Sequence, residues 1–322
     1  LNMVMVLGMN LTKMNNILLV DIGGTNMRHA IASSASNEIS DLSKSAFSDM
    51  TEFEDKLEDL ITNNFIDILI ASVAGPKINN CISMTNRDYV FDSIKIAKKF
   101  NLKECYLLND WEAIAHSYDY VSNSIKSIKD GKSFNENKLF IGPGTGLGAA
   151  VCINNEVILP TEVGNTTNST EFMLNIFKVN NANPITLENV ISGSAISNIY
   201  KIKTNKSLSS EEIFRRFIKE DQIATEVINS FIKSLAYTLS DLALTFNIGK
   251  SILFAGSLMR SLYPHIDKDI FHIDFINNKK NIHKDMLNAV HIGVITKEGS
   301  PLYGNLGFYK KWHPQEIYYF AI

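Results

Sequence analysis

The stretch Ile17-Leu-Leu-Val-Asp21-Ile-Gly-Gly-Thr-Asn26 decides the fold, because an apolar run ends there in an aspartate and two glycines. The run predicts a buried strand, and strand-like sequence returns at 28–32 after the glycines. Together they predict a β-hairpin. Adjacent glycines expose successive backbone N–H groups that can hold phosphate oxygens, although a tight turn that needs positive φ explains them equally well. The aspartate at the strand end favours the phosphate-binding interpretation.

A second glycine cluster, Gly142-Pro-Gly-Thr-Gly-Leu-Gly148, follows a predicted strand at 139–141 and precedes another at 149–153. The letters from Gly144 to Ala149 fit the G-x-G-x-x-A pattern of dinucleotide-binding proteins. That pattern requires a helix after it, and a strand follows here. We therefore predict a second phosphate-binding hairpin.

A third glycine motif, Gly249-Lys-Ser251, resembles the end of a P-loop, whose lysine and serine contact phosphates and magnesium. Leu244 occupies the place of the first P-loop glycine, and a strand at 252–255 follows where a helix is required. The sequence therefore excludes a P-loop here.

The rest of the chain alternates between the two periodicities of secondary structure, which predicts an α/β fold. Two glycine hairpins, each between strands, indicate two related halves that face a ligand cleft. Helices are predicted at 51–62, 92–100, 111–120, 210–220 and 227–246, and further strands at 66–73, 81–84, 106–108 and 252–255. Ser209 and Glu212 form a capping-box pattern before the fourth of these helices.

Candidate sugar-binding residues follow predicted strands or stand in unusual local sequence. Asn109 and Asp110 lie where a strand ends and a helix begins, a place that favours helix caps but also ligand sites in open α/β sheets. A carboxylate at 110 can accept the proton of an attacking hydroxyl. Glu162 and Glu188 are each ordinary surface charges when taken alone, and with the first pair they supply the convergent polar groups that sugar recognition needs. Arg28 receives no role.

Composition excludes several classes of protein. The chain has 322 residues, 45% hydrophobic and 20% charged, with a formal net charge of -3. These values predict a globular protein without the basic surface that nucleic acid or a membrane surface would require. Three widely separated cysteines favour a reducing, cytoplasmic location. Residues 1–13 are predicted to be an upstream-start extension or a non-native remnant.

Read in order, these motifs resemble those of the bacterial glucokinase family of the hexokinase/actin/Hsp70 superfamily. The resemblance runs from about residue 16 to near the C-terminus. Its motifs are Asp21 to Arg28, Ala74-Gly-Pro76, Met84-Thr-Asn86, Leu108-Asn-Asp110, Gly142 to Gly148, Glu162 to Asn165, Glu188 to Gly193 and Ala255-Gly256.

The resemblance implies the two-domain actin-like ATPase (ribonuclease H-like) fold with a central ligand cleft, and a homodimer. It implies a small α/β domain at 14–112 plus about 303–322, and a large one at 113–302. ATP and Mg²⁺ are the expected cofactors, with magnesium carried by ATP, reached by Asp21 through water, and no metal held directly by side chains. The implied sugar-binding residues are Asn109, Asp110, Glu162, Asn165 and Glu188, with Asp110 as the catalytic base. The implied nucleotide-binding residues are Asp21, Gly23, Gly24, Thr25, Asn26, Gly144, Thr145, Gly146 and Gly256.

Because the sequence departs from the family pattern at several positions, the identity of the sugar substrate is left open. Val163 and Asn165 stand where the family has a glycine and a histidine, Ser257 replaces a second glycine, and Ser192-Gly-Ser-Ala195 replaces Ser-Gly-Pro-Gly. The zinc-binding cysteine cluster of the related ROK sugar kinases is absent from the sequence. We predict ATP-dependent phosphorylation of glucose to glucose 6-phosphate. The alternatives are a kinase for another hexose or an amino sugar, and a catalytically weak sugar-sensing homologue.

Overall fold

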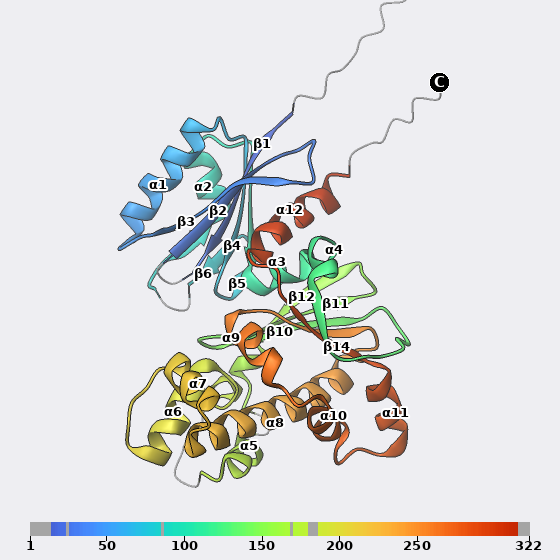
Figure 1. Cartoon of the computed structure of the whole chain (residues 1–322). Helices are drawn as coiled ribbons and strands as arrows, with labels where there is room; N and C mark the ends of the chain where they lie inside the picture. The colour runs from blue at the N-terminus through green and yellow to red at the C-terminus, as the bar shows by residue number, and fades with distance from the viewer. Residues whose placement is uncertain (1–13, 24–25, 85–86, 168–169, 180–185, 315–322) are drawn as a thin grey trace, which may run out of the picture. The chain divides into compact units, whose positions relative to one another are not determined.

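The structure is a computed structural model that describes residues 14–23, 26–84, 87–167, 170–179 and 186–314 (Figure 1). Contacts divide the chain into two compact units. The first unit is Leu1–Asn109 with Asn305–Ile322, and the second is Asp110–Gly304. The predicted domain limits, at 112/113 and 302/303, stay a prediction. Among the described residues, none of the helices combines the length and the apolar character needed to cross a bilayer.

The first unit is built on a five-stranded sheet with the order β3-β2-β1-β4-β8. β1 (Asn16–Ile22) and β2 (Asn26–Ser33) form the predicted hairpin, and β3 (Ile39–Ala46) extends it antiparallel. β4 (Ile68–Val73) runs parallel to β1, and β8 (Glu104–Asn109) runs parallel to β4. The parallel strands therefore end at one edge of the sheet, next to the glycine turn.

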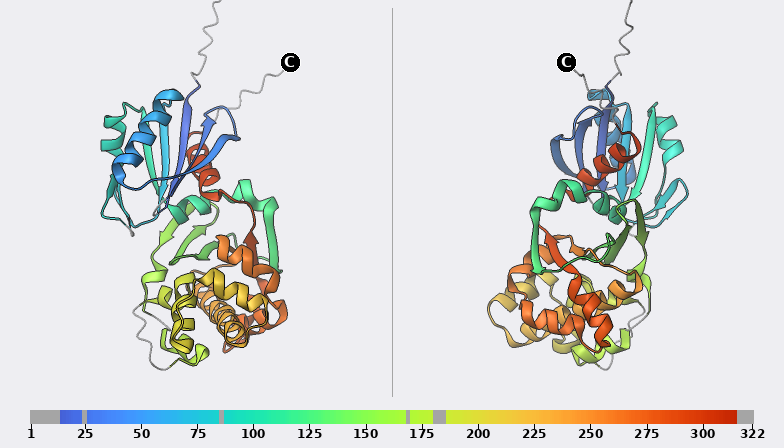
Figure 2. Two further views of the ribbon diagram at one scale, coloured as in Figure 1. Left: turned by 60° about the vertical axis from the view of Figure 1, so that its left-hand side comes forward. Right: turned by 90° about the vertical axis from the view of Figure 1, so that its right-hand side faces the viewer.

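Helices cover both faces of this sheet (Figure 2). α1 (Met50–Asn63) confirms the predicted helix and buries one apolar stripe against the sheet. α2 (Ser93–Lys99) precedes β8 in the chain. β1 and β4 are almost fully buried because helices cover both sides of them, which is why both sequences are nearly continuous apolar runs. α12 (Ser300–Trp312) brings the chain's last described helix back to this sheet.

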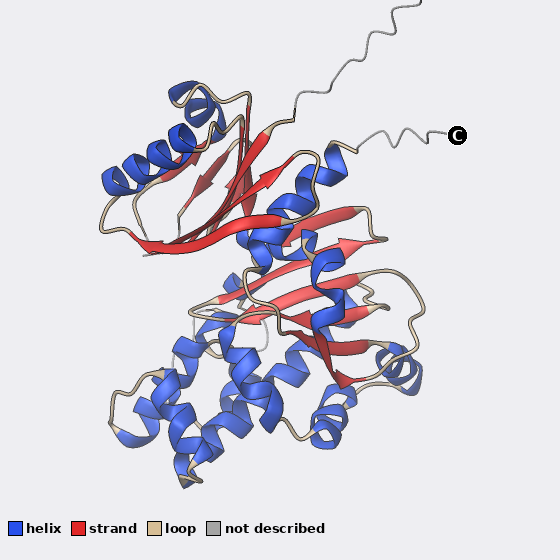
Figure 3. Ribbon diagram, turned by 45° about the horizontal axis from the view of Figure 1, so that its top comes forward, coloured by secondary structure: helices blue, strands red, loops and turns tan. Residues whose placement is uncertain are grey.

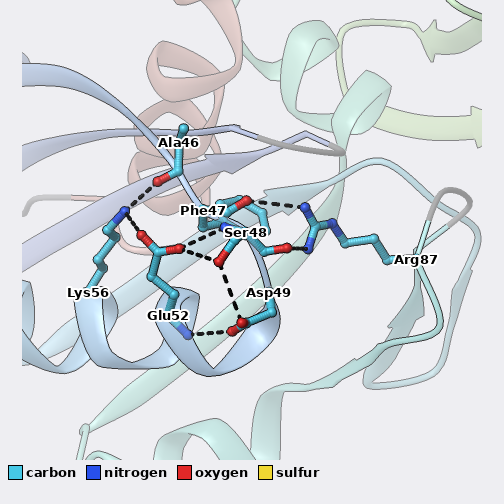
Figure 4. A network of polar contacts seen from close by, with 7 residues as sticks. All are labelled: Ala46, Phe47, Ser48, Asp49, Glu52, Lys56 and Arg87. Carbon is cyan, nitrogen blue, oxygen red and sulfur yellow. Dashed lines mark hydrogen bonds and ion pairs between the residues drawn. The ribbon is translucent and has the colours of Figure 1, made fainter.

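A polar network fixes the connection between β3 and α1 (Figure 4). The Arg87 guanidinium donates to the carbonyl oxygens of Ser48 at 3.0 Å and Phe47 at 3.2 Å, and lies 4.6 Å from the centre of the Phe47 ring. The Glu52 carboxylate accepts from the backbone N–H and the hydroxyl of Ser48, both at 2.7 Å. Hydrogen bonds from Lys56 and Ser48 lower the pKa of Glu52 to about 2. Arg87 therefore ties the segment after the Met84-Thr-Asn86 motif, whose last two residues lie outside the described ranges, to the start of α1.

Three short strands follow β4 and form a small separate sheet. They are β5 (Lys77–Ile78), β6 (Cys81–Ser83) and β7 (Val90–Asp92), paired antiparallel in that order. β6 confirms the short strand predicted at 81–84.

The second unit contains a six-stranded sheet with the order β12-β11-β10-β13-β14-β9 (Figure 3). Its first five strands repeat the order of the first sheet, an antiparallel meander followed by two parallel strands. The prediction of two related halves is confirmed at the level of topology. The strands are β9 (Ile125–Lys129), β10 (Lys138–Pro143), β11 (Leu147–Ile153), β12 (Val157–Thr161), β13 (Ser251–Phe254) and β14 (His291–Ile295).

A helical layer packs around α8 (Gln222–Thr245), which contributes the largest share of the apolar core of this unit. The helices in contact with α8 are α5 (Thr170–Phe177), α6 (Gly193–Thr204), α7 (Ser210–Ile218), α10 (Lys268–Ile276) and α11 (Asn281–Ala289). The Ser209 half of the predicted capping box of α7 is present, since the Ser209 hydroxyl oxygen accepts from the Glu212 N–H at 3.2 Å. α9 (Ser257–Leu262) follows β13.

One predicted helix is wrong in its extent. The segment 111–120 forms two short helices, α3 (Asp110–His116) and α4 (Tyr118–Val121), separated at Ser117. The Ser117 hydroxyl donates to the Ile114 carbonyl at 2.7 Å, a local hydrogen bond that competes with the helical pattern.

Candidate active site

The first glycine turn joins β1 to β2 and is closed by a hydrogen bond from the Gly23 N–H to the Asn26 carbonyl, at 2.9 Å. Gly24 and Thr25, two of the predicted nucleotide ligands, lie outside the described residues. Asp21 lies one residue before the end of β1 and is only 8% exposed. The turn therefore has a carboxylate at its base, at the strand end as the sequence predicts, and the structure adds that this carboxylate is buried.

Asp21 is held by two side chains. Arg28 donates to one carboxylate oxygen at 3.1 Å, and the Ser72 hydroxyl donates to the other at 3.2 Å. Burial raises the pKa of Asp21 above its ordinary value, and Arg28 and Ser72 counteract only part of this effect. Arg28 had no predicted role, yet counting outward from the hairpin turn pairs position 21 with position 28.

Asn305 on α12 joins the strands beneath Asp21. Its amide donates to the carbonyl oxygens of Val20 at 2.8 Å and Ile70 at 3.3 Å, and approaches the Ser72 hydroxyl at 3.4 Å. The side chain is fully buried. Asn305 thereby couples the C-terminal helix to the serine that holds Asp21, a role with no signal in the local sequence.

The predicted pair Asn109 and Asp110 falls at the division between the units. Asn109 ends β8, is buried, and donates from its amide to the Gly75 carbonyl at 2.9 Å. It therefore fixes the Ala74-Gly-Pro76 turn in the first unit. Asp110 begins α3 in the second unit.

Trp111 secures the start of α3 on the second glycine turn. A Cβ atom added to Gly148 would overlap the indole nitrogen of Trp111, and one added to Gly142 would overlap the far edge of the same ring. The two glycines are therefore required by the close approach of this aromatic ring. Asp110, the predicted base, directly precedes Trp111 in the chain, and the contact of this ring with the two glycines was missed by sequence reasoning.

Glu188 also lies against the second turn. The Leu147 N–H donates to the Glu188 carboxylate at 3.3 Å, and a Cβ on Gly146 would overlap the same oxygen. The Gly144 N–H closes the turn by donating to the Gly146 carbonyl at 2.8 Å. The structure therefore brings Glu188, predicted to bind sugar, together with residues predicted to bind nucleotide.

Glu162 precedes a short 3-10 helix, Val163–Asn165, whose last residue is Asn165, and this helix contacts both β11 and the 3-10 helix Leu187–Asn189 that carries Glu188. The Asn165 amide donates to the Glu162 carboxylate at 3.0 Å, and both side chains are exposed. Val163 is 8% exposed and belongs to the core of the second unit. The residue that departs from the family's glycine is therefore directed into the protein interior.

A cavity of about 470 Å³ opens beside Gly144 and Thr145. The N-terminal turns of α6 and α7 line it, together with α9, and α7 contributes Phe214. Helix N-termini present unpaired N–H groups and favour anions. The cavity therefore combines donors for an anion with an aromatic surface, and its α7 residues were not predicted.

Two of the residues that depart from the family pattern line this cavity. The Ser194 hydroxyl donates to the Thr145 carbonyl at 2.8 Å, and the neighbouring Gly193 N–H donates to the Gly144 carbonyl at 2.7 Å. Ser257 begins α9 after Gly256, which has a φ of 105°. Ser194 thus holds the turn by a side-chain hydrogen bond that a proline could not make.

Comparison with solved structures defines the class of protein. A glucokinase from an Antarctic psychrotroph is similar with a TM-score of 0.75 and 24% identity, covering 91% of this chain and 98% of that one. A ROK family glucokinase from Streptomyces griseus in complex with glucose and AMPPNP is similar with a TM-score of 0.62 and 15% identity, covering 90% and 98%. The fold is therefore the predicted two-domain actin-like fold of sugar kinases.

The particular family follows from the sequence. The family model described as Glucokinase matches residues 18–311, so the chain belongs to the glucokinase family. A curated glucokinase from Campylobacter jejuni subsp. doylei is 27% identical over 280 residues, which are 80% of this chain and 83% of that protein.

Proposed function

We propose that this protein transfers the terminal phosphate of ATP to glucose and forms glucose 6-phosphate. The observation that carries the proposal is the packing of Trp111, the residue that follows Asp110, on Gly142 and Gly148 of the second glycine turn, all within one unit. Membership of the glucokinase family supports the same reaction.

The nucleotide is assigned to the cavity beside Gly144 and Thr145. Backbone N–H groups of the turn and of the α6 and α7 termini suit the phosphates, and the Phe214 ring suits the face of a purine. Magnesium enters this scheme with the nucleotide and neutralises phosphate charge when bound. The described residues contain no group of three side chains that could hold a metal ion, and Asp21 is the carboxylate that we assign to the metal through water.

The sugar is assigned to Asn109, Asp110, Glu162, Asn165 and Glu188. Asp110 accepts the proton of the 6-hydroxyl as that oxygen attacks the phosphorus. The transition state of phosphoryl transfer is loose, so orientation of the hydroxyl contributes more than its activation. Carboxylates and amides at these positions accept and donate the hydrogen bonds that orient a hexose.

A second candidate is a kinase for another hexose or an amino sugar. The Asn165 amide already donates to Glu162, and this contact takes up one of the donors that would bind a glucose hydroxyl. A sugar with a different group at that position would use the Glu162 carboxylate instead. A homodimer in the cytoplasm is proposed for either enzyme, from the family resemblance.

The test is ATP turnover across a panel of sugars. We expect sugar-dependent ADP release in the presence of magnesium, with the highest kcat/KM for glucose among glucose, mannose, fructose, glucosamine and N-acetylmannosamine. A higher value for an amino sugar would transfer the proposal to the second candidate. Sugar binding by calorimetry without ADP release for any member would identify a sugar-sensing homologue and refute the kinase.

A further inference from the structure

A second cavity, of about 460 Å³, lies in the second unit at the amino ends of β13 and β14. Lys250 and Ser251 line it at the start of β13, and His291 lines it at the start of β14. The glycine turn follows the opposite, carboxyl end of β10, which runs parallel to β13. The length of β10, about 17 Å at 3.3 Å per residue, therefore separates this cavity from the turn.

The lining of the cavity favours an anion. Within the described part of the chain, no carboxylate is among its lining side chains, whereas Lys250 supplies a positive charge. Hydroxyl groups of Tyr118, Ser122 and Ser133 add donors along the wall. A neutral hydroxyl group can donate a hydrogen bond to a phosphate oxygen, and the positive charge of a lysine attracts the phosphate anion.

Ser251 provides a second, independent observation. It is 4% exposed, and its hydroxyl oxygen is buried without a hydrogen-bond partner in the described structure. A buried hydroxyl without a partner costs free energy, and such groups are rare in folded proteins. Because Ser251 also lines the cavity, a ligand oxygen there would give this hydroxyl a partner.

Three acidic residues stand near the cavity: Asp119 follows Tyr118 and is exposed, and the other two already accept hydrogen bonds. The Glu136 carboxylate lies 3.2 Å from the Lys250 ammonium group, and Asp130 accepts from the Ser127 hydroxyl at 2.6 Å. Glu136 is about half exposed, so its hold on the lysine is weak in water. An anion in the cavity would compete with Glu136 for Lys250.

We propose that this cavity is a second anion site, which binds a phosphate group through Lys250 and Ser251. These are the lysine and serine of the Gly249-Lys-Ser251 motif, which the sequence excluded as a P-loop because a strand follows it. The site uses the side chains of that motif without the helix N-terminus of a P-loop. Its ligand is inorganic phosphate or a phosphate monoester, and the proposal does not depend on the kinase reaction.

The test is calorimetric titration of the full chain with inorganic phosphate at constant ionic strength, in the presence of saturating AMPPNP, magnesium and glucose. We expect one phosphate to bind while the other ligands are present. A parallel titration with glucose 6-phosphate separates the sources, since tighter binding of the ester indicates a phosphorylated sugar and equal binding indicates phosphate alone. Loss of phosphate binding when AMPPNP is added would overturn the proposal.

Substitutions of Lys250 and of Glu136, which form an ion pair, should change the affinity for phosphate in opposite directions. Lys250→Gln removes a charge-assisted contact and is expected to weaken phosphate binding about tenfold or more. Glu136→Gln removes the competitor and is expected to strengthen it by roughly threefold. The same affinity in both variants as in the unaltered protein would refute the site.

A serine variant has a matched control in the same unit. Ser251→Ala should weaken phosphate binding without lowering the melting temperature, because the lost hydroxyl has no partner in the structure. Ser240, on α8, is likewise fully buried with an unpaired hydroxyl but does not line the cavity. Ser240→Ala should leave phosphate binding unchanged, and an equal loss in both variants would contradict a role for Ser251.

Discussion

The two sheets repeat one strand order but secure their glycine turns in different ways. The first turn has a buried carboxylate at its base, Asp21, paired across the hairpin with Arg28. The second turn has no charged residue from Gly142 to Gly148 and is covered by the Trp111 indole. A duplicated backbone therefore supports an ion pair in one half and aromatic packing in the other.

This difference divides the chemistry between the halves. The second turn carries no charged residue of its own and presents backbone N–H groups that suit an anion, although the Glu188 carboxylate lies against it at Gly146 and Leu147. A carboxylate at the equivalent edge repels a free phosphate and suits a metal-bound one instead. The comparison predicts that changes at the second turn act through packing, and changes at the first act through charge.

The largest expected effect is that of Asp110→Asn, because this residue begins the helix held on the second turn. Loss of a general base costs roughly 10²- to 10⁴-fold in turnover, and an asparagine keeps the size of the side chain and its hydrogen bonding to a sugar. We expect kcat to fall by at least roughly 100-fold while the dissociation constant of the sugar changes little.

Asp119→Asn is the control for this variant, since Asp119 is exposed on α4 in the same unit. Steady-state kinetics and calorimetric sugar titration measure the two quantities. Near-normal turnover of the Asp110 variant would refute the assignment of Asp110 as the catalytic base. The residues of the second unit would then contribute to ligand binding and not to proton transfer.

Gly148→Ala should have the next largest effect, on stability. An added Cβ would overlap the Trp111 indole, and overpacking of this kind costs about 1–3 kcal/mol. Gly144→Ala, in the same turn, is the matched control because no atom lies within 4 Å of its added Cβ. Urea unfolding compares the free energies of unfolding. Equal stability of the two variants would show that aromatic packing does not hold the second turn.

The parts of the molecule that the sequence predicts are those with local signals. Buried parallel strands such as β1 and β4 are continuous apolar runs, and the glycine clusters mark the turns between strands. β3 was missed because six of its eight residues are exposed and its sequence, Ile-Ser-Asp-Leu-Ser-Lys-Ser-Ala, is largely polar. Its strand character comes from pairing with β2 rather than from its own residues.

The candidate active site, too, was predictable only where the signal lies in the local sequence. Single residues such as Asp21 were predictable from their place at a strand end, whereas the Arg28 pairing was missed although the hairpin register indicates it. The contact of Trp111 with Gly148 and the support of Ser72 by Asn305 join segments distant in sequence. Only the folded chain brings such residues together, so no local pattern indicated them.

Asp21→Asn tests the role of charge at the first turn through the pH dependence of stability. Burial raises the folded-state pKa of Asp21 above its ordinary value of 3.8, so the folded protein binds this proton more tightly than the unfolded one. Stability is therefore lost as pH rises from about 3.8 through the folded pKa, and the loss remains above it. Asparagine does not ionise, so the variant should gain stability relative to the unaltered protein over that rise.

Urea unfolding between pH 3 and pH 8 measures this difference, and Asp59→Asn is the control because Asp59 is exposed on α1 in the same unit. We expect the effect to be smaller than that of Gly148→Ala, since the half-exposed Arg28 offsets part of the burial. If the stability difference between the two proteins stays constant across this pH range, the folded-state pKa of Asp21 is not raised by burial.

The smallest expected effect is that of Asn165→His, which restores the residue typical of the family. The Asn165 amide donates to Glu162, and an imidazole N–H at this position would supply a donor to a sugar hydroxyl. A single net hydrogen bond contributes about 0.5–1.5 kcal/mol, so we expect the KM for glucose to fall roughly threefold with little change in kcat. Asn175→His, on α5 in the same unit, controls for the added imidazole. An unchanged KM would show that position 165 does not contact the sugar, and would leave Asp110, Glu162 and Glu188 as the proposed sugar-binding residues of the second unit.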